Sequence, residues 1–170
     1  MSVAAADIYK AVVAVWAAAG LDSQFKSYWP AADRVEFPAL CEAEAEGSHP
    51  FPYCVFSLMG GKTKTKMSGA GGTASNKHNE IRDIPLRFKI HAKSTTVLSG
   101  KAIAAALADE VLKVFGGHPT VSPAFDNYAL DNGHILISQY QLDQGMRDED
   151  IEVYVWLIHY NLKSDVPVMV

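Results

Sequence analysis

Two glycine–lysine pairs are the first candidates for chemistry in this sequence, because such pairs occur in loops that hold phosphate groups. They are Gly61-Lys62-Thr63 and Gly100-Lys101. A phosphate-binding loop needs a further glycine five residues earlier, so that successive backbone amides can surround the phosphates. Phe56 and Thr95 occupy those two positions. The sequence therefore lacks this motif.

Histidines and cysteines could supply metal ligands, a general base or a nucleophile. The six histidines stand singly, at positions 49, 78, 91, 118, 134 and 159, so no pair has the three- or four-residue spacing of helical metal ligands. Cys41 and Cys54 lack the surroundings of a known catalytic cysteine, and no Gly-x-Ser-x-Gly motif occurs. The cysteines are expected to be reduced thiols, with one disulfide between them as the alternative. We expect no catalytic residue, no metal, no cofactor and no enzyme activity.

Acidic residues cluster late in the sequence, and paired carboxylates can act as a catalytic acid and base when a cleft holds them. The cluster comprises Asp143, Asp148, Glu149, Asp150 and Glu152. No such cleft is visible in the sequence. A solvated hairpin turn over Arg147-Asp148-Glu149-Asp150 accounts for these side chains instead.

Residues 60–79 have the most unusual composition, with five glycines, four lysines and no acidic residue. Such a segment cannot bury a core, so we expect a mobile loop, which is uncommonly long for a compact domain. It has no aromatic ring on which a base could stack. Two interpretations stay open: a solvated loop, or a segment that orders against an acidic partner or lines a channel carrying DNA. The lysines are Lys62, Lys64, Lys66 and Lys77.

The composition is that of one ordinary globular domain. The chain has 170 residues, 49% of them hydrophobic and 20% charged, which suffices for one sizeable core but not for two domains. Its net charge of -4 excludes a basic field over the whole protein, while a local basic patch stays open. The apolar run 4–19 contains Asp7 and Lys10 and lacks the features of a signal peptide or membrane span. We expect a cytoplasmic protein with no membrane partner.

Periodicity predicts the elements that must position these groups. Apolar residues at three- and four-residue spacing predict helices over 3–19 and 99–115, the second capped by Ser99. Alternating or continuous apolar runs predict four strands, over 53–58, 81–92, 133–143 and 152–162. The segment 39–46 fits either a helix or irregular structure. In the strand over 81–92, Arg87 and Lys89 lie on a basic outer face.

This order of elements predicts a single α+β domain. Its antiparallel or mixed sheet has about four or more strands, and the two helices pack on one face. We expect the following side chains to be buried in the monomer or at an interface: Trp16, Val55, Phe88, Leu107, Val111, Leu157 and Ile158.

The order of elements resembles the tail-terminator, or tail-completion, family of long-tailed bacteriophages and prophages, which includes the minor tail protein U of phage lambda. The resemblance rests on an N-terminal helix with Ile8-Tyr9-Lys10-Ala11-Val12-Val13 and on the strand Phe51-Pro52-Tyr53-Cys54-Val55-Phe56-Ser57. It continues with a long loop, the strand 84–90, the helix 100–107 and the late strand 150–161. The loop at 60–79 is longer than expected, and residues 118–132 have no clear counterpart.

The resemblance implies a ring, commonly a hexamer, that caps the tail tube and joins it to the head. Its partners would be the tail-tube protein, the head-connector proteins and DNA passing without sequence specificity, first in the host cytoplasm and then in the virion. We hypothesise that the basic loop 60–79 of one subunit, with Arg87 and Lys89, meets the acidic residues of the next subunit, which are Asp148, Glu149, Asp150 and Glu152. The alternatives are another neck or tail-tube component, and a small ligand-binding or catalytic α+β domain.

Overall fold

The computed structural model describes residues 5–58, 62–66, 77–125, 128–129, 135–148 and 152–169. For several strand segments, among them 62–66 and 77–83, the description covers the backbone and not the side chains.

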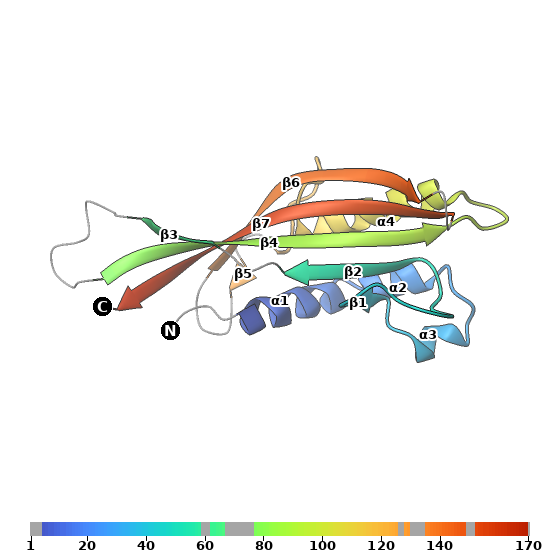
Figure 1. Ribbon diagram of the computed structural model, residues 1–170, viewed down its shortest axis with the longest axis horizontal. Helices are drawn as coiled ribbons and strands as arrows, with labels where there is room; N and C mark the ends of the chain where they lie inside the picture. The colour runs from blue at the N-terminus through green and yellow to red at the C-terminus, as the bar shows by residue number, and fades with distance from the viewer. Residues whose placement is uncertain are drawn as a thin grey trace.

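The fold is built on one mixed seven-stranded sheet with the strand order β1-β2-β4-β7-β6-β5, and β3 pairs with β4 (Figure 1). The short strand β1 runs parallel to β2, and all other pairs are antiparallel. The central strands β4 and β7 pair over their full 17 residues. The strands are β1 Leu40–Cys41, β2 Tyr53–Leu58, β3 Lys62–Lys66, β4 Lys77–Lys93, β5 Tyr128–Ala129, β6 Ile135–Asp148 and β7 Val153–Met169.

Among the described residues, four helices accompany the sheet, and the two longest, α1 and α4, cover the same face. The ring of Phe88 on β4 lies 6.2 Å from Trp16 of α1 and 4.6 Å from Phe115 of α4. One side chain therefore joins both helices to the sheet, and the predicted α+β fold with two helices on one face is confirmed. The helices are α1 Ala5–Ala18, α2 Leu21–Lys26, α3 Asp33–Glu36 and α4 Gly100–Phe115.

Local sequence signals account for the main elements. The Ser99 hydroxyl accepts a hydrogen bond from the Ala102 N–H at 3.2 Å, which caps α4 as predicted. Gly116, with φ of 124°, ends that helix in a conformation that other residues rarely adopt. Along β4, Phe88 and its even-numbered neighbours are buried beneath the helices, whereas Arg87 is exposed.

The predicted core is largely confirmed. Six of the seven side chains are buried, and the exception, Leu157, is half-buried opposite Lys89 on the sheet face away from α1 and α4. The buried ones are Trp16, Val55, Phe88, Leu107, Val111 and Ile158.

Three sequence-based predictions need correction. Residues 62–66 and 77–79 were expected in a loop but form β3 and the start of β4, paired from Lys66 opposite Asn79 to Lys62 opposite Asp83. Residues 59–61 and 67–76 lie outside the described part of the chain. Arg147 and Asp148 were expected in a turn but continue β6, opposite Tyr154 and Val153 of β7. Residues 40–41, left open between helix and irregular structure, pair with β2 as β1.

The sheet is longer than the layer of helices beneath it. Figure 1 shows β3, β4 and β7 extending together past the start of α1. We call this extension the ribbon and define it as residues 62–66, 77–83 and 163–169. Its strands are held to one another by backbone pairing, from Lys77 opposite Met169 to Asp83 opposite Lys163.

Candidate interaction surfaces

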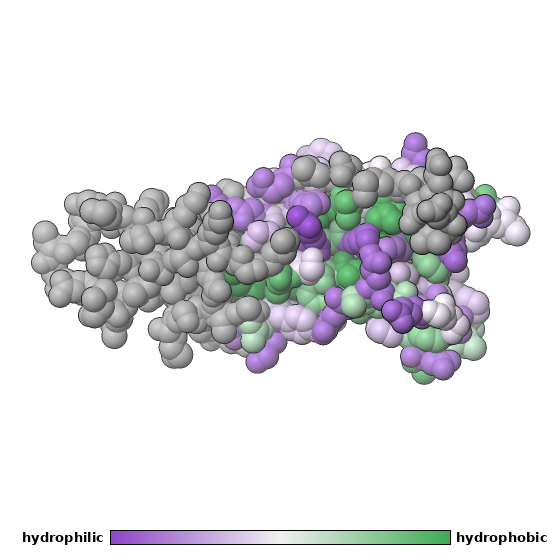
Figure 2. Space-filling view, in the orientation of Figure 1, coloured by the Kyte–Doolittle hydropathy of each residue, from purple (hydrophilic) through white to green (hydrophobic). Residues whose placement is uncertain are grey.

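The sheet face away from α1 and α4, which we call the open face, carries the basic residues predicted from β4. Arg87 lies opposite His159 of β7, and Lys89 lies opposite Leu157. Burial, and then the positive charge of Arg87, lower the pKa of His159. In the view of Figure 1, α4 lies behind β4 and β7, so Figure 2 shows the open face, where hydrophobic and hydrophilic residues lie side by side.

One end of the open face is covered by residues 42–51, which we call the strap. Glu44 of the strap forms an ion pair with Lys89. The ammonium group of Lys93 lies over the Phe51 ring, 4.4 Å from its centroid. The Lys89 side chain, predicted to contact another molecule, is therefore engaged within its own subunit, whereas Arg87 stays exposed.

Beneath the strap, aromatic rings stack against two histidines. The Tyr53 ring lies 4.7 Å from the His91 ring and almost parallel to it, at 9°. The His49 ring of the strap also contacts the Tyr53 ring, with 4.8 Å between the ring centroids. Burial, and then the positive charge of Lys89, lower the pKa of His91 from 6.5 to about 4, against an opposing effect of Glu44. His91 is therefore neutral at pH 7.

The lysines predicted to form an interaction site lie on the ribbon. Lys62, Lys64 and Lys66 belong to β3, opposite residues 83, 81 and 79 of β4, and Lys77 is the first residue of β4. Their side chains lie outside the described part of the structure. The structure thus brings the four residues to one end of the sheet.

The predicted acidic patch is described only in part. Asp148 is the last residue of β6, opposite Val153, and its side chain is outside the described part. Glu149 and Asp150 lie outside it altogether. Glu152 is exposed and begins the return into β7 with a φ of 53°.

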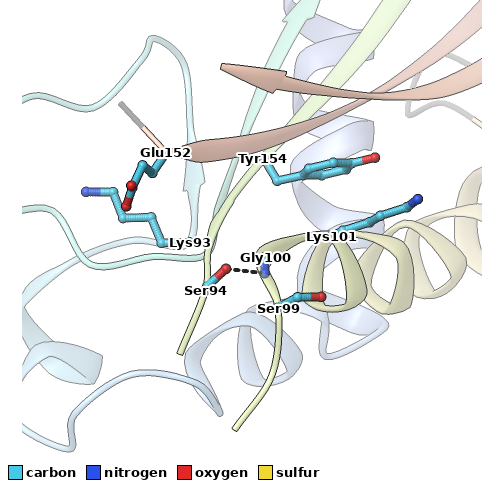
Figure 3. Close-up of a pocket in the computed structure, with 7 residues that line it drawn as sticks. All are labelled: Lys93, Ser94, Ser99, Gly100, Lys101, Glu152 and Tyr154. Atoms are coloured by element: carbon cyan, nitrogen blue, oxygen red, sulfur yellow. Dashed lines mark hydrogen bonds between the residues drawn. The ribbon is translucent and has the colours of Figure 1, made fainter. Parts of the chain in front are cut away.

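Glu152 lines a cavity of about 500 Å³ at the start of α4 (Figure 3). Its charged side chains have both signs, because Lys93 and Lys101 line it together with Glu152. The Gly100 N–H donates to the Ser94 hydroxyl at 2.9 Å, and the Ser99 hydroxyl caps a second amide. Two amides of the first turn of α4, those of Gly100 and Ala102, therefore already bind side-chain hydroxyls.

A second, more apolar groove follows α1 where it meets β2. Tyr9, Phe56 and Leu58 line it, and the Tyr9 hydroxyl donates a hydrogen bond to Glu42. Tyr9 and Val13 keep 36% and 37% of their surface exposed, so α1 has apolar contact area on its outer side.

The described residues hold no recognisable catalytic or metal site. The two cysteines are free, and burial raises the pKa of both thiols, so neither is a ready thiolate nucleophile. No group of three or more His, Cys, Asp or Glu side chains in the described part could hold a metal ion. No helix in the same residues is long and apolar enough to cross a membrane.

Sequence reasoning missed the strap and the residues that it covers. The only signal was the alternation along β4, which placed His91 with Arg87 and Lys89 on the outer face. Nothing local in the sequence links Glu44 to Lys89, because 45 positions separate them.

Comparison with known proteins finds similarity to solved structures but not to a protein family. No protein-family model and no curated protein matches the chain. A solved structure described as the virion of a native gene transfer agent (GTA) particle is similar, with 15% sequence identity and a TM-score of 0.40. The alignment covers 86% of this chain and 92% of that chain. A TM-score and a sequence identity this low support no statement about the function of this chain.

Proposed function

We propose that this protein is a structural component of a bacteriophage or prophage tail or neck, and that its copies form a ring capping the tail tube. Apart from the long loop, part of which forms β3 and the start of β4, the fold has the order of elements on which the resemblance to tail-terminator proteins rests: α1, β2, β4, α4 and the late strands β6 and β7. In this role the protein assembles in the host cytoplasm. In the virion it contacts the tail-tube protein, the head connector and a second copy of itself.

The ribbon is the observation that supports the proposal most. Within the described part of the chain, β3 pairs with β4 alone, and the pairing of β6 with β7 ends at Ser164. Both outer edges of the ribbon therefore present backbone N–H and C=O groups without a neighbouring strand among the described residues. Open strand edges are templates for pairing with another chain. A neighbouring subunit would supply such a strand.

The subunit has two differently charged surfaces, one basic and one acidic, and this difference favours a ring over a symmetric dimer. Ring assembly needs two different patches on each subunit, one meeting the other on the neighbour. The open face carries Arg87 and His159, whereas Glu152 directly precedes Val153, the first residue of β7. We keep the proposed pairing of the basic and acidic residues across the subunit boundary, without Lys89, whose partner is Glu44.

A ligand-binding or catalytic domain is the second candidate, favoured by the cavity at the start of α4. That cavity contains Lys93, Lys101 and Glu152. Its charges are mixed and two of its helix amides, those of Gly100 and Ala102, bind side-chain hydroxyls, so it offers no evident set of groups converging on one substrate atom. We therefore rank assembly above catalysis.

Shortening the ribbon tests the proposal. Replacing residues 62–77 by a short Gly-Ser turn removes β3 and leaves the helix-covered body intact, so the melting temperature should change little. Native mass spectrometry of the wild type should show a closed ring of several copies, and the shortened protein should be monomeric. Tails assembled with it should have the wrong length or fail to join heads.

Val97→Ser is the matched control, because Val97 is 86% exposed on a turn away from the ribbon. This variant should form the same ring as the wild type. A wild type that stays monomeric at high concentration and on purified tail tubes would refute the ring. A shortened protein that still forms rings would refute the role of the ribbon.

A further inference from the structure

The strap contacts the open face through two lysines of β4. Glu44 is paired with Lys89, and the Phe51 ring lies under the ammonium group of Lys93, 4.4 Å from its ring centroid. The strap is also held outside the open face, because the His49 ring nitrogen Nε2 lies 3.0 Å from Pro38 O.

Next to the Glu44–Lys89 pair lies a buried histidine, His91, two residues further along β4. His91 keeps 6% of its surface exposed, and its Nε2 is buried without a hydrogen-bond partner in the described part of the structure. Tyr53 stacks on its ring and Val155 lies beside it on β7. A positive charge here would be buried without an acceptor, which is costly.

The charged and titratable groups around His91 do not remove this cost. Lys89 and Lys93 lie on its own strand, and Lys89 disfavours a second positive charge. Tyr53 of β2 is neutral, and its pKa is raised by burial. Glu44 of the strap favours the charge, but it is already paired with Lys89.

We propose that the strap, residues 42–51, is released from the sheet by acid, and that its release uncovers the basic open face. Protonated His91 reaches water when the section of the strap around Glu44 moves away from β4. The movement also breaks the Glu44–Lys89 pair and frees Lys89 beside Arg87. The strap thus masks the surface proposed to contact other subunits, but its release does not depend on that function.

The expected effect follows from linkage between opening and protonation. His91 binds a proton more weakly when covered, with a pKa near 4 against 6.5 in the open form. The open form is therefore favoured as the pH falls below 6.5, and the effect is complete near pH 4. At pH 5.0 the opening equilibrium should be about 30-fold higher than at pH 7.5.

Hydrogen exchange of the full chain, followed by mass spectrometry at pH 7.5 and 5.0, measures this opening. After correction for the intrinsic pH dependence of exchange, peptides from 42–51 should exchange about 30-fold faster at pH 5.0. Peptides from α4 should not change. His91→Phe keeps the ring stacked on Tyr53 but cannot titrate, so it should abolish the acceleration.

His159→Gln is the matched control, because it removes a histidine from the open face at a position opposite Arg87. In this variant the strap should still exchange faster at pH 5.0. His91→Gln is the second test variant if the phenylalanine variant does not fold. Equal exchange of the strap at both pH values in the wild type would overturn the proposal. So would acceleration that persists in both His91 variants, or loss of protection in α4 together with the strap.

Discussion

At the scale of single residues, two glycines with left-handed backbone conformations show how the surroundings decide the free-energy cost of adding a side chain. Gly117 has a φ of 101°, and a Cβ added there would lie 2.6 Å from a ring carbon of Tyr140. Gly20 has a φ of 69°, and a Cβ there would meet nothing within 4 Å. The first position combines strain with a steric clash, and the second has strain alone.

Gly117→Ala should therefore lower the free energy of unfolding by roughly 1–3 kcal/mol, more than Gly20→Ala does. Urea unfolding of both variants measures the difference. Equal losses in the two variants would show that the Tyr140 ring moves aside at little cost.

At the scale of elements, the sequence was sufficient to predict a helix or strand wherever the periodic apolar face of that element packs against the core. Helices α1 and α4 and strands β2 and β4 were predicted because their apolar residues recur at helical or strand spacing. Strand β3 was missed because its Lys-Thr-Lys-Thr-Lys sequence has no apolar face and lysine is uncommon in strands. Its pairing comes from the backbone of β4, a tertiary contact that local composition does not encode.

The strap was missed for a related reason. His91 belongs to the outward-facing residues of β4, yet it is buried and the Tyr53 ring stacks on it. The ion pair between Glu44 and Lys89 joins distant positions of the chain. Neither feature follows from periodicity, which says which side of a strand a residue occupies but not what covers that side.

Leu107→Ala tests the face assigned to α4. Leu107 is 2% exposed and belongs to the hydrophobic core, so the truncation should cost about 2–5 kcal/mol of unfolding free energy. Val97→Ala, at a site 86% exposed, should change it by less than about 0.5 kcal/mol. Both values come from denaturant melts, and a loss for Leu107→Ala as small as that of the control would mean that the helix face is misassigned.

At the scale of the whole molecule, the proposed contact between unlike surfaces makes assembly sensitive to charge. Arg87 is exposed, so Arg87→Glu should leave the melting temperature nearly unchanged while weakening the ring. Added salt should weaken the wild-type ring too, because exposed charges are screened.

Lys10→Glu is the control for the charge change, since Lys10 is exposed on α1 and outside the proposed basic patch. Light scattering over a dilution series at low and high salt gives the assembly state. An Arg87→Glu ring as stable as the control's would remove the open face from the interface.

The pairing of β4 with β7 has a consequence for how the chain reaches its fold. Lys93 pairs with Val153 and Lys77 with Met169, so the middle of the sheet joins residues that are far apart in the sequence. Contacts of this kind close late and slow folding. During synthesis β2 and β4 emerge first, and one edge of β4 stays without its partner until the last part of the chain has left the ribosome. Nascent chains therefore pass through a stage in which that edge is open to mispairing, and chains ending before β7 should aggregate rather than form a smaller stable body.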